Sequence, residues 1–329
     1  MRRLLIALLA FFCLLTGCSA NSKTTEQQPS DLDTLFDNQP ADNEVGSASF
    51  AMDDPIETVY PYNGQPLEIP FTICGAEAGT NTEIGVLLFV DGVAQPYKAV
   101  YADGAELSEA YMQTFHLEYE QQENFRMVFQ PVTGKAGETV SVMAVTILKP
   151  SFVAEGENNP RYGFYHGESA TIPRHISFAV DAPPQVAAVP TADYNITELP
   201  KDVVDTMAAW GSLEDLDTTA VLSLVTEDGN VIRSNGKTAK VTLRLYGGPE
   251  ATFHITLFIN HQPVRINNSD YLSVNTQKNK MVEATFQLDT VGLDELNTIY
   301  AIAATAGADD ALEVNNPIKT QSILLVNKQ

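Results

Sequence analysis

Apolar and polar residues alternate along much of this chain. Alternate apolar positions occur at Ile69, Phe71 and Ile73, and again at Val241, Leu243 and Leu245. A period of two places such side chains on one face of a β-strand, and Val and Ile suit a pleated surface with one buried face. Gly, Pro, Asn and Asp separate the alternating segments, at spacings typical of an all-β domain.

The chain also repeats itself. NGQPLEIPFTICG (63–75) aligns without gaps on NGKTAKVTLRLYG (235–247), an offset of 172 residues. Further segments repeat in the same order at falling offsets: 169 for 84–96 on 253–263, 157 for 125–145 on 282–302, and 146 for 176–180 on 322–326. Both copies hold Asn-Asn-Pro, at 158–160 and 315–317. This order predicts one domain present twice.

We therefore predict an all-β fold with two tandem β-sandwich domains of Ig-like character, at residues 50–181 and 202–329. The Cys–Trp–Cys set of true immunoglobulin domains is absent, so architecture and not family is predicted. A helical pattern covers 202–216. Four prolines in 182–201 favour an extended linker, and hence limited contact between the sandwiches.

The N-terminus carries an export pattern. Arg2 and Arg3 precede an apolar run, 4–15, that is too short for a bilayer core of about 30 Å. It has the length of a signal-peptide core. The run ends in Leu15-Thr16-Gly17-Cys18, which resembles the lipobox of bacterial lipoproteins.

This resemblance implies that 1–17 is a signal peptide cleaved after Gly17 and that Cys18 receives a diacylglyceryl group. No other cofactor is expected. Acylated in this way, the chain would be anchored in a lipid bilayer outside the cytoplasm. An ordinary secretory signal with a chance cysteine is the alternative.

Residues 18–49 are polar and acidic, which predicts a disordered tether. The formal net charge of the chain is −23, and it becomes −25 once Arg2 and Arg3 leave with the signal peptide. Such a charge repels phosphate polymers, so nucleic acid is excluded as a partner. Cys13 also leaves and Cys18 is acylated, so an intrachain disulfide is not expected; Cys74, in LEIPFTICG, is predicted to be a buried structural thiol.

The two copies differ at two insertions in the first. The drop in offset from 157 to 146 assigns eleven extra residues to RYGFYHGESATIPRH. Exposed rings beside an arginine suit a binding surface, so this loop is a candidate partner site. The alternative is a hydrophobic cap over the sandwich end or the second domain. The candidate residues are Arg161, Tyr162, Phe164, Tyr165 and His166. A second insertion of twelve residues, around YADGAELSEAYMQ, is predicted to be a turn or short helix.

Catalytic motifs are missing from the sequence: there is no G-x-S-x-G, H-E-x-x-H, Walker loop, G-x-G-x-x-G or C-x-x-C. His254 and His261 are predicted to be surface or edge residues and not zinc ligands. Acidic loops flank the Asn-Asn-Pro elements, and oxygen-rich loops of this kind hold calcium in some sandwiches. The weak calcium candidates are Glu155 and Glu157 in the first copy, and Asp309, Asp310 and Glu313 in the second.

These observations predict a non-enzymatic, membrane-anchored surface lipoprotein that binds a protein or a glycan. Two alternatives remain at this stage. One is an accessory subunit of an envelope transporter or secretion complex, and the other is an enzyme of unrecognised type.

Overall fold

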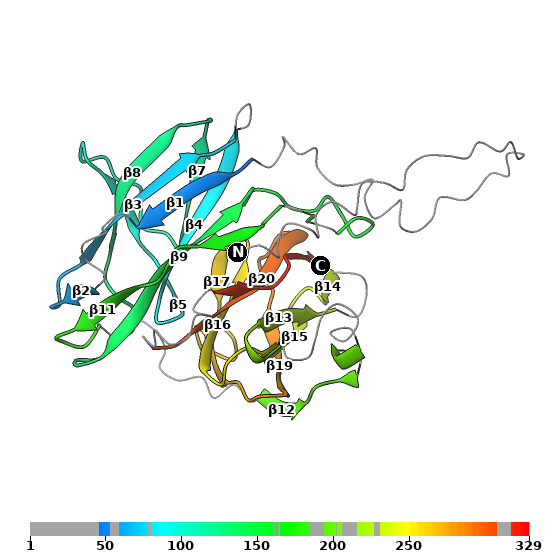
Figure 1. The fold of residues 1–329 in the computed structure, drawn as a ribbon. Coiled ribbons are helices and arrows are strands. Elements are labelled where there is room, and N and C mark those ends of the chain that lie inside the picture. The colour runs from blue at the N-terminus through cyan, green and yellow to red at the C-terminus, as the bar shows by residue number, and fades with distance from the viewer. Residues whose placement is uncertain are drawn as a thin grey trace, which may run out of the picture. The chain divides into compact units, whose positions relative to one another are not determined.

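The computed structural model describes residues 46–52, 59–77, 81–160, 162–163, 165–183, 194–201, 203–205, 216–226, 231–307 and 317–328. All of them belong to one compact unit of the chain. Within these ranges, no helix is both long enough and apolar enough to cross a membrane. Strands dominate, as Figure 1 shows.

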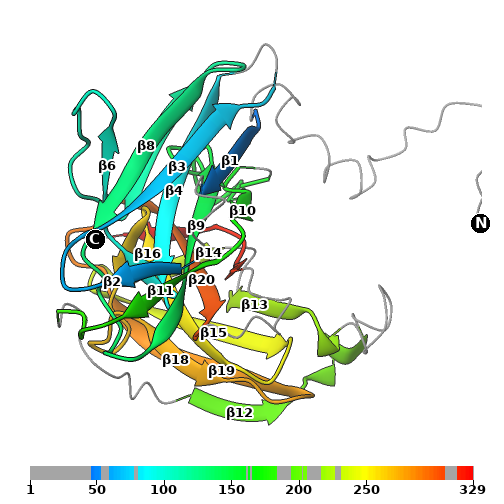
Figure 2. The same cartoon turned by 60° about the vertical axis from the view of Figure 1, so that its left-hand side comes forward.

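Eleven strands build the first sandwich: β1 (Ala48–Met52), β2 (Val59–Tyr62), β3 (Leu67–Gly75), β4 (Thr82–Val90), β5 (Val93–Gln95), β6 (Lys98–Tyr101), β7 (Met112–Leu117), β8 (Gln122–Phe129), β9 (Thr139–Leu148), β10 (Glu168–Ala170) and β11 (Arg174–Phe178). One sheet has the order β1-β3-β8-β6. The other has the order β2-β11-β9-β4-β5, with β10 beside β9 and β7 beside β4. The first two strands therefore lie in different sheets: β1 pairs in the first sheet and β2 in the second (Figure 2).

The second sandwich repeats this plan with β12 (Tyr194–Glu198), β13 (Ala220–Val225), β14 (Val231–Ser234), β15 (Thr238–Gly247), β16 (Thr252–Ile259), β17 (Gln262–Val264), β18 (Leu272–Asn275), β19 (Lys280–Asp289), β20 (Leu296–Thr305), β21 (Ile318–Lys319) and β22 (Ile323–Asn327). Here β14 pairs with both β15 and β22, so the two halves connect into one sheet of order β12-β19-β15-β14-β22-β20-β16-β17.

Each sandwich has its own apolar core, which the alternation predicted. In β3 the buried side chains are those of Leu67, Ile69, Phe71 and Ile73, and they pack with the inward residues of β4, β8 and β9. In β15 the buried set is Ala239, Val241, Leu243 and Leu245. The predicted all-β, Ig-like double sandwich is confirmed.

Strand pairing defines the repeat more sharply than the sequence did. Phe71 pairs with Phe125 in the first sandwich and Leu243 pairs with Ala284 in the second, so β8 and β19 differ by 159 residues and not 157. A slip of two residues preserves an alternating pattern, so the apolar positions did not reveal it.

The last strand needs a larger correction. Val140 pairs with Ile176, and the matching residue Asn297 pairs with Leu325, which gives an offset of 149 instead of 146. The first copy's loop before β10 is therefore eight residues longer than its counterpart, not eleven. Strand β22 is buried at all five positions, so it has no alternation that could set the register.

Different parts of the chain close the same sheet edge in the two sandwiches. In the first, β6 pairs with β8, and Tyr101 lies opposite Phe125. In the second, β12 pairs with β19, and Tyr194 lies opposite Ala284, the residue that matches Phe125. The second insertion therefore contributes a strand and a turn, not a helix. The predicted linker contributes a strand as well, because β12 lies within 182–201.

Two further predictions are answered in part. Residues 201 and 203–205 are helical, whereas the rest of the predicted helix up to 215, with Trp210, lies outside the described residues. Cys74 is not buried as predicted. It is partly exposed on the outward face of β3, because the inward positions of this strand are those of Ile73 and Phe71.

A glycine in the loop between β8 and β9 makes room for the first core. Gly134 has φ +127°, and a Cβ placed there would lie 2.3 Å from the buried Phe178 ring. Gly137, in the same loop, has φ +89° and no atom within 4 Å of such a Cβ.

We expect Gly134→Ala to lower the free energy of unfolding by about 2–4 kcal/mol, since backbone strain and a core clash add, and Gly137→Ala by about 1 kcal/mol from strain alone. Urea denaturation of a soluble form, residues 18–329 with Cys18→Ser, measures both. Equal losses in the two variants would show that the Phe178 ring moves aside freely.

Candidate functional site

The two sandwiches share a buried apolar contact, which corrects the prediction of limited contact between them. Strands β4, β9, β16 and β20 are buried on both faces along nearly their whole length. In β4, Val86 and Leu88 face the first core, whereas Leu87 and Phe89 join a separate cluster. This cluster, here called the inter-sandwich contact, contains Leu87, Phe89, Ala94, Met143, Val145, Ile147, Phe258, Tyr300, Ile302 and Ala304.

Equivalent residues of the two copies meet at this contact. Phe89 and Phe258 occupy the same repeat position, and their rings pack edge-on with centroids 6.2 Å apart. A similar bond closes each end of the contact, although the residues that make the two bonds are one position apart in the repeat, because Asp91 matches Asn260 and His261 matches Gly92. Asp91 Oδ1, after β4, accepts the Gly307 N–H at 2.6 Å, and His261, after β16, donates from Nε2 to the Pro150 carbonyl at 2.6 Å. Gly307 and Pro150 are equivalent, so the surface is self-complementary, like that of a two-fold dimer.

The aromatic loop, residues 150–167, packs on the second sandwich. Tyr162 is 1% exposed and its hydroxyl lies 2.8 Å from Thr298 Oγ1; His166 is also 1% exposed, with Nδ1 3.0 Å from Ser322 Oγ. Tyr165 packs on Phe152, with ring centroids 4.1 Å apart and ring planes tilted by 31°. The prediction of a partner-binding loop is corrected for the two buried residues, which form the predicted alternative, a cap against the second domain. Arg161 and Phe164 lie outside the described residues.

An ion-pair network ties the same loop down. Glu157 accepts hydrogen bonds from Arg233, at 3.0 Å, and from Lys328. These cations lower the pKa of the Glu157 carboxyl. A carboxylate held by two cations from the second sandwich is a poor calcium ligand, so Glu157 serves the contact between domains. The other calcium candidates Asp309, Asp310 and Glu313 lie outside the described residues, and within those ranges no three His, Cys, Asp or Glu side chains lie together as a metal-binding group.

The histidines of the second copy belong to the contact and not to the surface. His254 is 8% exposed and donates from Nδ1 to the Asp91 carbonyl at 2.6 Å. His261 accepts the Tyr300 hydroxyl at Nδ1, 3.0 Å away, while Nε2 binds Pro150. Both histidines therefore bridge the sandwiches, which corrects the expectation of surface or edge residues.

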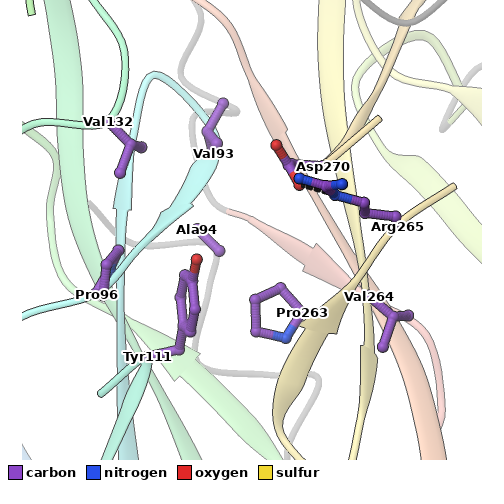
Figure 3. A pocket seen from close by; sticks show the side chains of 9 residues that line it. All are labelled: Val93, Ala94, Pro96, Tyr111, Val132, Pro263, Val264, Arg265 and Asp270. Atoms are coloured by element: carbon purple, nitrogen blue, oxygen red, sulfur yellow. Dashed lines mark hydrogen bonds and ion pairs between the residues drawn. The ribbon is translucent and has the colours of Figure 1, made fainter. Parts of the chain in front are cut away.

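A cleft opens beside the contact, between the hairpins β4–β5 and β16–β17 (Figure 3). Its volume is about 190 Å³. Val93, Ala94 and Pro96 form one wall. The buried Val132 and the half-buried Tyr111 lie beside them. Pro263 and Val264 form the opposite wall, and at its rim Arg265 Nε donates to Asp270 Oδ1 at 3.0 Å.

The cleft has two chemically different halves built from equivalent positions. Strand pairing matches Ala94 with Pro263, Pro96 with Arg265, and Tyr111 with Asp270. The first copy therefore supplies a ring and apolar walls, and the second supplies an ion pair. Burial and nearby carboxylates raise the pKa of the Tyr111 hydroxyl, which keeps it a hydrogen-bond donor at neutral pH.

Sequence reasoning missed this cleft because its residues come from turns with no motif. One signal was present. IGVLLFV (84–90) and HITLFI (254–259) are continuous apolar runs, which indicate strands buried on both faces and hence a second packed layer.

A larger groove of about 460 Å³ lies on the outer face of β15 and β19. Its cations are mostly paired: Arg244 with Glu283 at 2.7 Å, and Arg233 with Glu157. The cleft is the better candidate site, because apolar walls and polar groups converge there.

No family model and no curated protein matches this chain. Solved structures match with low similarity. A chaperone–tip adhesion subunit complex of Csu pili from Acinetobacter baumannii covers 83% of this chain and 98% of its own, at 11% identity and TM-score 0.20. Fibronectin(III)-like modules of Clostridium thermocellum CbhA match over 86% of this chain and 95% of their own, at 9% identity and TM-score 0.22. The structure of the Salmonella enterica SafA pilin in complex with the SafB chaperone matches over 84% of this chain and 96% of its own, at 14% identity and TM-score 0.21. At these values the likenesses carry no function over to this chain.

The Tyr162–Thr298 hydrogen bond tests the role of the aromatic loop. We expect Tyr162→Phe and Thr298→Val each to destabilise the soluble form, and the double variant to lose about 1 kcal/mol less than the sum of the two, because the buried hydrogen bond is broken once. Urea denaturation of the four proteins measures this coupling. Additive losses would mean that the loop does not hold the second sandwich through this bond.

Proposed function

We propose that this protein is a lipid-anchored binding protein displayed outside the cytoplasmic membrane, which binds a protein or glycan without catalysis. The lipobox-like segment ending at Cys18 and the acidic residues after it support the anchor and the tether. The inter-sandwich cleft supports the binding role.

The observation that carries the proposal is the convergence of Tyr111, Arg265 and Asp270 on a cleft with apolar walls. Ligand pockets usually enclose about 300–1,000 Å³ and combine apolar walls with a few placed polar groups. At about 190 Å³ the cleft is smaller, so it fits one side chain or one sugar ring of a larger ligand. A ring would pack on Tyr111, and its polar edge would meet the ion pair.

The anchor has a direct test. In the native host, the chain should incorporate labelled palmitate and fractionate with membranes. Cys18→Ser should abolish the label and release the protein, because the thiol that forms the thioether is gone. Cys74→Ser, which changes the other cysteine of the mature chain, is the control and should keep both properties. Label retained in the Cys18 variant would refute the anchor.

The cleft has a separate test. The soluble form is screened on glycan arrays and immobilised extracellular matrix proteins, and titrated with the ligand identified. We expect Arg265→Ala to weaken binding at least about tenfold, because one charge-assisted hydrogen bond to the bound ligand is lost. Arg126→Ala is the matched control, because Arg126 pairs with Glu68 on the outer sheet of the first sandwich at similar exposure.

Equal effects of the two arginine substitutions would place binding elsewhere on the molecule. No ligand in either screen would favour the accessory-subunit alternative, for which crosslinking in intact cells is the test.

A further inference from the structure

Buried basic groups gather at one end of the inter-sandwich contact. The rings of His166, from the first sandwich, and His261, from the second, lie with centroids 5.2 Å apart. The Lys319 side chain is 9% exposed, and its Nζ lies 5.1 Å from the centroid of the Tyr300 ring. The contact therefore places two imidazoles and an ammonium in one water-poor region.

The hydrogen bonds around the histidines suit neutral rings. His261 donates from Nε2 to Pro150 and accepts the Tyr300 hydroxyl at Nδ1, so a second ring proton would force the Tyr300 hydroxyl to turn and accept instead of donate. His166 uses Nδ1 with Ser322, whereas its buried Nε2 has no hydrogen-bond partner among the described residues. A proton at Nε2 would create a buried charge. Burial lowers the pKa of His166 more than hydrogen bonding to the backbone of Phe152 and Lys149 raises it.

The surrounding charges act in the same direction. Burial, His261 and Lys319 lower the pKa of His166 to about 3. Burial and Lys319 also lower the pKa of His261, which Glu83 and the Pro150 carbonyl partly oppose. Tyr162 and Tyr300 complete the surroundings, and burial raises the pKa of both hydroxyls, so they stay neutral.

We propose that acidification separates the two sandwiches while each stays folded, because His166 and His261 gain protons when the inter-sandwich contact opens to water. The open state exposes the apolar faces of β4, β9, β16 and β20. The sandwiches persist because their two cores are distinct from the contact cluster and contain neither histidine. This inference does not depend on the ligand of the cleft.

The sign follows from linkage. A histidine with a depressed pKa in the closed state binds fewer protons there than in the open state, so closure is favoured above about pH 6.5 and loses ground as the pH falls. Each such histidine shifts the open-to-closed ratio about tenfold per pH unit, and two shift it up to about a hundredfold.

Other titratable groups at the contact act mostly outside this range or against it. Glu157 is the exception: Lys328 and Arg233 lower the pKa of its carboxyl, so its protonation, at the lower pH where carboxyls titrate, also favours opening. Burial lowers the pKa of Lys319 to about 8, so it stays a cation throughout acidification. Burial raises the pKa of Asp91, whose protonation would favour closure, at the lower pH where carboxyls titrate. His254, the third histidine at the contact, donates from Nδ1 to the Asp91 carbonyl, and the same nitrogen lies 3.9 Å from the Asp91 carboxylate.

The experiment follows the soluble form from pH 7.5 to 4 by small-angle X-ray scattering and by binding of an apolar dye, with far-ultraviolet circular dichroism in parallel. We expect the radius of gyration and the dye signal to rise together between about pH 6 and 4, while the strand signal stays constant. The logarithm of the open-to-closed ratio should fall with pH at a slope approaching 2.

Histidine variants test which side chains take up the protons when the contact opens. His166→Gln and His261→Gln should each reduce the slope by about 1, and together they should remove the pH dependence above about pH 5, where carboxyls do not yet titrate, even if the double variant is already partly open at pH 7. His116→Gln, at an exposed position of β7, is the control and should keep the parent slope. An unchanged slope in both histidine variants overturns the proposal. So does loss of the strand signal together with opening, or a constant radius down to pH 4.

Discussion

The apolar contact between the two sandwiches is the constraint on which the described structure depends. It makes strands that would face water in a free sandwich into strands buried on both faces, and for this reason β4, β9, β16 and β20 read as continuous apolar runs. Exposed in a separate domain, such a surface would favour aggregation. The contact therefore also explains why the two copies pair at neutral pH, and why the aromatic loop and its buried Tyr162 lie where they do.

Near two-fold symmetry explains how one protein obtains an asymmetric cleft. A symmetric pair of identical domains would line such a cleft with two copies of each residue. Duplication within one chain frees the copies to diverge, so that Tyr111 stands where the second copy has Asp270, and Pro96 where it has Arg265. The cleft thus combines an apolar half with a charged half, which suits a ligand with two unlike ends better than a symmetric one.

Much of the fold could be predicted from the sequence, whereas the site could not. Alternation at Ile69, Phe71 and Ile73 reports one buried face, and the repeat doubles that information. A register error of two residues could not be detected because the period of a strand is two. The register of β22 could not be predicted because all five of its positions are buried, so apolar and exposed positions do not alternate. The aromatic loop was singled out as unusual, but composition does not tell whether a ring faces solvent or a neighbouring domain. That distinction needs the other surface, and so do the cleft and the buried histidines.

The covalent connection between the sandwiches sets how they find each other. Because β12 already belongs to the second sandwich, residues 184–193 are what separates the last described residue of the first sandwich from the first strand of the second. At about 3.5 Å per residue, such a segment spans at most about 38 Å even when fully extended. Two surfaces joined by a covalent linker of this length meet at an effective concentration in about the millimolar range. Their association is then a unimolecular event whose rate and equilibrium do not depend on the concentration of the protein.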